Sequence, residues 1–110
     1  MYSVTKAIIT LAALAAPSIA FSGDMTYYAP GLGSCGQTNS ESDAVVAMSP
    51  NQNGNCGKQI IISYGGKTAT ATVADLCPGC AGDSIDVSPV VFEQLADLAA
   101  GRVQVTWQWA

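Results

Sequence analysis

Alternating apolar and polar residues predict β-strands along most of the chain after residue 20. In segment 67–74 threonines alternate with alanine and valine, and in segment 103–109 valine and tryptophan alternate with glutamine and threonine. This two-residue period places the apolar side chains on one face of a strand. Three shorter runs rich in apolar and aromatic residues, at 25–28, 44–48 and 59–64, end at clusters of Gly, Pro or Ser and are also typical of strands.

The clearest turn joins segments 59–64 and 67–74 through Gly65 and Gly66. Both positions of such a two-residue turn favour positive φ, which glycine adopts without strain. The pair therefore predicts a β-hairpin.

A single helix is predicted near the C-terminus. Ser88 is a favourable N-cap, Pro89 suits the first helical position, and Gly101 suits the residue that ends a helix. Apolar residues between them recur at a spacing of about 3.6 residues; they are Val91, Phe92, Leu95, Leu98 and Ala99. The chain is therefore expected to be mostly β with one short helix at about 89–100.

The N-terminal segment predicts a secretory signal peptide, residues 1–20. Lys6 precedes a 10-residue apolar stretch, 7–16, which is followed by Pro17 and by small residues up to Ala20. A membrane anchor is the alternative, but a helix that spans a bilayer needs about 20 apolar residues. We expect one soluble domain at 21–110, secreted to the outside of the cell or to the cell wall.

The composition excludes several kinds of catalytic site, metal site and partner. The chain contains no His, which excludes Ser–His and Cys–His catalytic pairs and His-ligated metal sites. We therefore expect no metal and no cofactor. Once Lys6 leaves with the signal peptide, three basic and eight acidic residues remain, a net charge of −5. Such a charge disfavours nucleic acids and anionic membranes as partners. Neutral polymers and other proteins remain, and we expect a monomer.

Four cysteines, an even number in a small exported domain, point to two disulfides. Three pairings are possible, and we favour Cys35–Cys56 with Cys77–Cys80. Two other interpretations remain open. A zinc site usually has two close cysteine pairs, whereas only Cys77 and Cys80 are close here. A redox role for these two requires a helix that begins at the motif, and a loop with Gly and Asp follows instead.

Two acidic residues lie where strands meet loops. Asp75 ends one strand, and Asp86 sits between Ile85 and Val87, so it faces a groove or solvent if these two face the core. One interpretation is structural: Asp86 accepts hydrogen bonds from amides at the start of the helix, and Asp75 braces the turn at Cys77. The other is that both line a ligand groove.

The order of several short motifs resembles that of a known family. The motifs are Thr26-Tyr27-Tyr28, Gly33-Ser34-Cys35-Gly36, Cys56-Gly57-Lys58, Val73-Ala74-Asp75 and Ile85-Asp86-Val87-Ser88. Together they are similar to the RlpA-like double-psi β-barrel domain of rare lipoprotein A, barwin-like proteins and expansins. The likeness covers about residues 23–110 and points to small secreted single-domain members of fungi and streptomycetes. It implies a disulfide-stabilised, six-stranded double-psi β-barrel with a shallow polysaccharide groove.

The resemblance also implies which residues line that groove. In expansins a Thr on the first strand, an aromatic after it and two Asp are the matching positions, and the second Asp is needed for wall loosening. The corresponding residues here are Thr26, Tyr28, Asp75 and Asp86, which we expect to bind glycan. Two departures stand out. Expansins usually have an aromatic where this chain has Cys77, and the lytic transglycosylase members use a His that this chain lacks.

Three hypotheses about function follow. The first is an expansin-like or barwin-like protein that binds or loosens cell-wall polysaccharide (cellulose, chitin or peptidoglycan) without hydrolysis, because a shallow groove offers little of the burial that a proton-donating carboxyl needs. The alternative is an inhibitor of a secreted papain-like cysteine protease, as a streptomycete member of the family is, or an effector; either would use loop 29–36 or 76–84. A lesser alternative is a glycan-cleaving enzyme with Asp75 and Asp86 as catalytic candidates.

Overall fold

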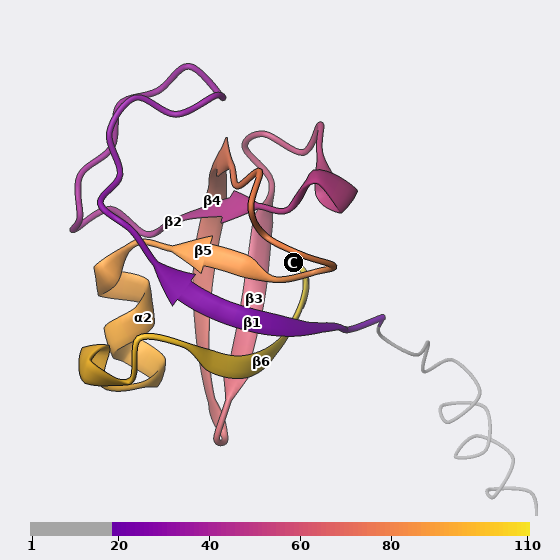
Figure 1. Ribbon diagram of the computed structural model, residues 1–110, viewed down its shortest axis with the longest axis vertical. Coiled ribbons are helices and arrows are strands. Elements are labelled where there is room, and N and C mark those ends of the chain that lie inside the picture. The colour runs from indigo at the N-terminus through magenta and orange to yellow at the C-terminus, as the bar shows by residue number, and fades with distance from the viewer. Residues whose placement is uncertain (1–18) are drawn as a thin grey trace, which may run out of the picture.

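Six strands close into a barrel (Figure 1). The computed structural model describes residues 19–110, so the predicted signal peptide lies almost entirely outside the described residues. The strands are β1 (Phe21–Tyr27), β2 (Val45–Met48), β3 (Gln59–Tyr64), β4 (Lys67–Leu76), β5 (Ile85–Val87) and β6 (Val103–Trp109). Around the barrel they follow the order β1-β5-β2-β4-β3-β6. This confirms the six-stranded barrel expected from the sequence.

Two of the strand pairs are parallel, β1 with β5 and β2 with β4, and the others are antiparallel. Parallel neighbours cannot be joined by a tight turn, so each pair brings together distant parts of the chain. Thr26 of β1, for example, lies opposite Asp86 of β5. The parallel pairs therefore decide which polar residues become neighbours on the barrel wall.

The β3–β4 hairpin forms as predicted, with Gly65 and Gly66 at φ values of 57° and 81°. Two strands are longer than expected. β1 begins at Phe21, because its first residues pair with β6. β4 continues to Leu76, because its last two residues pair with β2.

The predicted helix at 89–100 is too long. The α-helix α2 covers only Pro89–Leu95, and a separate 3-10 turn, η2, covers Leu98–Ala100. Between them the Asp97 side chain accepts a hydrogen bond from the Ala99 amide and so caps a new turn. The Ser88 hydroxyl makes no cap hydrogen bond to α2; it accepts one from the Val45 amide instead. A second 3-10 turn, η1, covers Pro50–Gln52.

The barrel interior is filled by apolar side chains from the strands and from α2. Trp107 is buried, stacks on Phe21 with ring centroids 4.4 Å apart, and meets Trp109 edge-on at 5.2 Å. Its indole N–H donates to the Asp83 carbonyl. Other buried core residues include Met25, Val46, Met48, Ile60, Ile62, Ile85, Val87, Val91, Phe92 and Leu95. Within residues 19–110, helices are too short or too polar to cross a bilayer.

Two disulfides join Cys35 to Cys56 and Cys77 to Cys80. This is the pairing favoured from the sequence. The first ties the long loop between β1 and β2 to the segment that precedes β3. The second lies within a tight turn after β4.

The two disulfides are expected to contribute unequally to stability. Chain-entropy estimates give about 3 kcal/mol for the Cys35–Cys56 loop and about 2 kcal/mol for the much shorter Cys77–Cys80 loop. The double variant Cys35→Ser/Cys56→Ser should therefore lower the free energy of unfolding more than Cys77→Ser/Cys80→Ser, as measured by urea denaturation. An equal or larger loss for the second variant would contradict this ranking.

Candidate functional site

Four residues on adjacent strands form one row across the barrel wall. Thr26 of β1 is opposite Asp86 of β5, Asp86 is opposite Ala47 of β2, and Ala47 is opposite Asp75 of β4. Directly opposite residues project to the same face of a sheet. The neighbours of the row along the strands are buried in the core; they include Met25, Val46, Met48, Ile85 and Val87. The row therefore faces away from the core.

Asp75 reaches this face because the register of β4 shifts by one residue. Along β4, Ala69, Ala71 and Val73 are buried, so simple alternation would also turn Asp75 toward the core. Between Val46 and Ala47 of β2 the pairing shifts, and Ala74 is the extra residue of β4. Such a shift redirects the side chains that follow it. It turns Asp75 outward, two strands away from Asp86.

The loop around Gly33 covers the shifted part of β4. The Cys35 amide donates to the Ala74 carbonyl, and a Cβ on Gly33 would collide with the same carbonyl oxygen. The loop can approach this closely because position 33 carries no side chain. The Cys35–Cys56 disulfide fixes it there. This packing gives a physical reason for the Gly33-Ser34-Cys35 motif.

Asp75 is held as a carboxylate by backbone amides. One of its oxygens, Oδ1, accepts hydrogen bonds from the amides of Ser34 and Leu76, each 2.8 Å long. Burial raises the pKa of Asp75, but the hydrogen bonds from Ser34 and Leu76 outweigh it and bring the pKa below its ordinary value. The hydrogen bonds of Asp75 go to the end of β4 and to the distant loop that carries Ser34, whereas the Cys77 amide donates to the Met48 carbonyl, so Asp75 does not brace the Cys77 turn as expected.

Asp86 has the opposite environment. The Thr26 hydroxyl donates a 3.0 Å hydrogen bond to Asp86 Oδ1. Among the described residues, Asp86 accepts no hydrogen bond from the amides at the start of α2, so that expectation was wrong. Burial raises the pKa of Asp86; the Thr26 hydrogen bond and the positive charge of Arg102 act against this rise. Both strand neighbours of Asp86 are buried, so the sequence correctly indicated the direction of its side chain.

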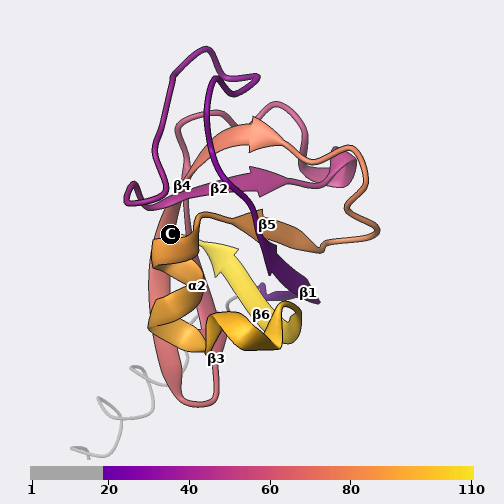
Figure 2. The same ribbon diagram turned by 60° about the vertical axis from the view of Figure 1, so that its left-hand side comes forward.

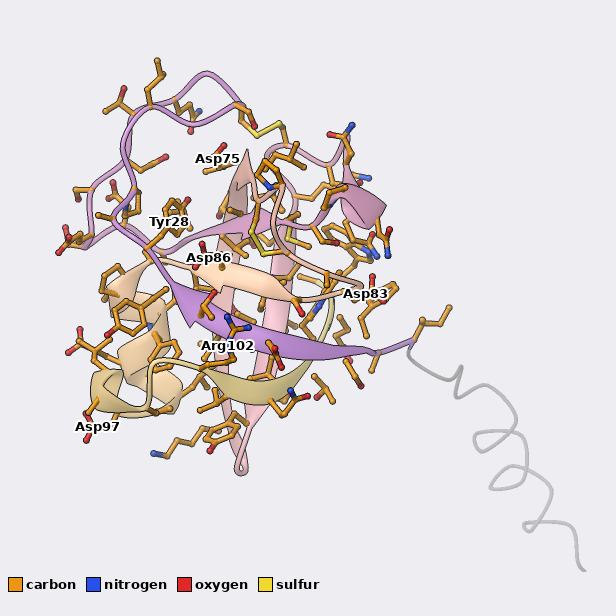
Figure 3. The ribbon with its side chains drawn as sticks, viewed as in Figure 1. Tyr28, Asp75, Asp83, Asp86, Asp97 and Arg102 are labelled. Atoms are coloured by element: carbon orange, nitrogen blue, oxygen red, sulfur yellow. A yellow bond between two sulfur atoms is a disulfide. The ribbon has the colours of Figure 1, made fainter. Side chains whose placement is uncertain are left out.

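Tyr28 connects the two acids. It follows β1, and its amide donates to the Val87 carbonyl of β5. Burial and then the negative charges of Asp75 and Asp86 raise the pKa of Tyr28 to about 12. The Tyr28 phenol is therefore close enough to both carboxylates to interact with them electrostatically. Figure 3 shows Asp75, Tyr28, Asp86 and Arg102 following one another across the molecule.

The structure therefore brings together all four residues expected to bind glycan. Asp75 and Asp86 are two strand spacings apart, roughly 10 Å. Ala47 lies between them on β2, and its side chain is only 3% exposed, so other groups cover the strand between the two acids. Within residues 19–110, no cluster of three or more His, Cys, Asp or Glu side chains is placed to hold a metal ion.

Sequence reasoning missed Arg102 and Asp24, which lie beside this row. The Arg102 Nη1 donates to Asp24 Oδ2 over 2.8 Å, although the two residues are 78 positions apart. A local pattern gives no signal for such a pair. Together with Thr26 they line a hollow of about 220 Å³, whose other side is formed by residues between Cys77 and Ser84.

Comparison with known proteins shows which families and proteins this chain resembles. A family model described as lytic transglycolase matches residues 20–107. The "Allergen Asp f 7 homolog" of Arthroderma benhamiae is 50% identical over 82 residues, which are 66% of this chain and 28% of that protein. The chain thus spans less than a third of that relative. A papain inhibitor of Streptomyces mobaraensis is 36% identical over 99 residues, 79% of this chain and 69% of the inhibitor.

Two kinds of solved structure share the fold. The Streptomyces papain inhibitor has a TM-score of 0.75 and 34% identity, and the match covers 87% of this chain and 99% of the inhibitor. A mutant expansin of Clavibacter michiganensis, solved in complex with cellohexaose, has a TM-score of 0.77 and 24% identity over 84% of this chain and 50% of the expansin. At that identity the expansin shows the fold alone.

The environment of Asp75 predicts a pH-dependent contribution to stability. A pKa below the unfolded value of 3.8 means that Asp75 stabilises the fold above that pH and loses this effect as the pH falls through its folded pKa. Asp75→Asn should lower the free energy of unfolding by about 1–2 kcal/mol near neutral pH, because charge-assisted hydrogen bonds are lost. The difference from the unaltered protein should shrink below about pH 4.

Urea denaturation across this pH range measures the effect. Glu93→Gln, which removes an exposed negative charge on α2, is the matched control and should change little. A difference between Asp75→Asn and the unaltered protein that stays constant with pH would contradict the assignment.

Proposed function

The chain belongs to the lytic transglycolase family of RlpA-like double-psi β-barrels, and on this premise we propose that it binds cell-wall polysaccharide and loosens its packing without cleaving it. The candidate polymers are cellulose, chitin and peptidoglycan. The observation that carries the proposal is the outward row Thr26, Asp86, Ala47 and Asp75, beside which the Tyr28 phenol interacts with both carboxylates. We further propose that the protein acts outside the cell, where its two disulfides are stable.

The chemistry of the row suits a neutral glycan. Carboxylates accept hydrogen bonds from sugar hydroxyls, and such charge-assisted bonds are stronger than neutral ones. Thr26 and Tyr28 supply hydroxyl groups that can donate or accept, and an aromatic ring offers an apolar face to a sugar ring. Asp75 and Asp86 lie on the same outward face, so one chain of sugars could contact both carboxylates.

The same geometry argues against hydrolysis. A glycosidase needs one carboxyl that stays protonated as general acid, and inverting enzymes separate their two carboxyls by about 6.5–9.5 Å. Burial raises the pKa of Asp86 above its ordinary value, but the Thr26 hydrogen bond and the positive charge of Arg102 oppose this rise and so limit its use as a proton donor. The backbones of Asp75 and Asp86, two strand spacings or roughly 10 Å apart, lie near the upper end of that range. Asp75 also has one oxygen occupied by two amides.

The proposal predicts a specific loss in Asp86→Asn. Replacing the carboxylate by an amide removes a charge-assisted acceptor, so binding to insoluble polysaccharide should weaken about ten-fold, equivalent to about 1.4 kcal/mol. Co-sedimentation with cellulose, chitin and peptidoglycan measures this, and reducing ends are assayed in the supernatant. Glu93→Gln, with the same change of charge on α2, should bind as the unaltered protein does.

Two outcomes would contradict the proposal. One is the absence of binding to all three polymers. The other is release of soluble oligosaccharide that Asp86→Asn abolishes, which would make the protein a glycan-cleaving enzyme.

Inhibition of a secreted cysteine protease is a second candidate function. The match to the Streptomyces papain inhibitor spans nearly the full length of that protein at 34% identity. A loop between β1 and β2 stands away from the barrel (Figure 2) and carries Leu32, which is 76% exposed. A bridge between Leu32 and Thr38 and the Cys35–Cys56 disulfide hold this loop. A preorganised loop loses little entropy when it enters a protease cleft.

This candidate predicts a different mutational pattern. Leu32→Asp places a charge where an apolar side chain would enter the protease, so inhibition of papain should fall by at least ten-fold. Asp86→Asn should inhibit papain as well as the unaltered protein. The inhibition constant against a fluorogenic peptide substrate is the measurement, and an unchanged constant for Leu32→Asp would exclude this loop.

A further inference from the structure

Arg102 is fixed beside the row of polar residues by a small network. It precedes β6 and forms an ion pair with Asp24, whose second oxygen, Oδ1, accepts a hydrogen bond from the Gln104 side chain. The Asp24 amide in turn donates to the Ser84 hydroxyl. Asp24 is therefore held from its backbone and at both carboxylate oxygens. It cannot move without breaking contacts to two other segments, the start of β6 at 102–104 and Ser84 before β5.

This network places the guanidinium in the hollow that Thr26 lines, on the side of the barrel where Thr26 bonds to Asp86 of β5. Asp24 and Thr26 lie two positions apart on β1 and so project to the same face. Arg102 and Thr26 line one hollow, and the Thr26 hydroxyl donates to Asp86. Arg102 is mostly exposed, so its remaining N–H groups stay free after it pairs with Asp24.

The other described basic residues lie elsewhere. The Lys58 ammonium lies over the Trp109 ring, 5.9 Å from its centroid, and Lys67 follows the β3–β4 turn. The charged and titratable groups around Asp86 are Arg102 with its partner Asp24, the Tyr28 phenol and, beyond that phenol, Asp75. Arg102 is the one positive charge among them.

We propose that Arg102 is a positioning residue that keeps the Asp86 carboxylate ionised, and that Asp24 holds Arg102 in the place where it does so. Asp86 is half-buried among apolar neighbours, an environment that disfavours a charge. A nearby guanidinium offsets this cost. If Asp86 binds sugar hydroxyls, a step that rests on the proposed function, Arg102 extends binding toward acidic pH.

A carbon-13 NMR titration of the Asp86 side-chain carboxyl tests the charge effect without any ligand. Arg102→Gln should shift the titration midpoint of Asp86 upward, because the offsetting charge is gone. Lys67→Gln, which removes the same charge at the distant hairpin, should leave the midpoint unchanged. Arg102→Lys should restore most of the original midpoint, because it returns the charge.

Asp24→Ala tests the positioning role. Removing a negative charge near Asp86 would by itself move its midpoint downward. Loss of the contact that holds Arg102 should instead move it upward, in the same direction as Arg102→Gln. A downward shift in Asp24→Ala, or an unchanged midpoint in Arg102→Gln, would overturn the proposal.

Binding of cellohexaose and chitohexaose, followed by calorimetry from about pH 7 to about pH 3, connects this effect to function. The lower pH limit of binding should rise in Arg102→Gln and stay the same in Lys67→Gln. An upward shift of the Asp86 midpoint in a protein that binds neither hexasaccharide would support the role of Arg102 and count against the proposed function. If the lower pH limit of binding does not change when the titration midpoint of Asp86 shifts, the link between Asp86 ionisation and binding is wrong.

Discussion

The candidate site depends on a one-residue shift in the pairing of β2 with β4. Before the shift, alternate residues of β4 up to Val73 fill the core. Ala74 is the extra residue, and after it the alternation reverses, so that Asp75 faces outward in line with Asp86. The shift costs regular pairing, and contacts from a distant loop compensate for it. The Cys35 amide binds the Ala74 carbonyl, and Gly33 leaves room for that approach.

This arrangement gives two aspartates on one surface different properties. Two amide donors lower the pKa of Asp75, whereas burial raises the pKa of Asp86 and Thr26 and Arg102 only oppose that rise. A surface of this kind has fixed acceptors at both ends and the Tyr28 hydroxyl between them. The loop that carries Leu32 protrudes from the barrel (Figure 2), although its residues Ser34 and Cys35 also contact the end of β4. Glycan binding and protease inhibition would thus use different side chains, Asp86 and Leu32, and variants of these two can separate them.

Local patterns predicted most of the fold, because period-two alternation, the Gly65-Gly66 turn and the motif order are all visible along the chain. They failed where distant contacts decide. The helix was expected to continue to about residue 100, but Asp97 caps a new turn that the apolar spacing conceals. The outward direction of Asp86 followed from its buried neighbours. The direction of Asp75 did not, because a shift relative to β2 has no signature in β4 itself. The Arg102–Asp24 pair could not be predicted either, because the two residues are 78 positions apart and no local pattern links them.

The central claim is that Asp75 and Asp86 share one outward face with Tyr28 between them. Carbon-13 NMR titration of the Tyr28 ring tests it most directly, since burial and then the negative charges of Asp75 and Asp86 raise the pKa of Tyr28 to about 12. The account predicts that Asp75→Asn and Asp86→Asn each lower this pKa, and that the double variant lowers it further. A Tyr28 titration that does not respond to Asp75→Asn would place Asp75 outside the row and contradict the account.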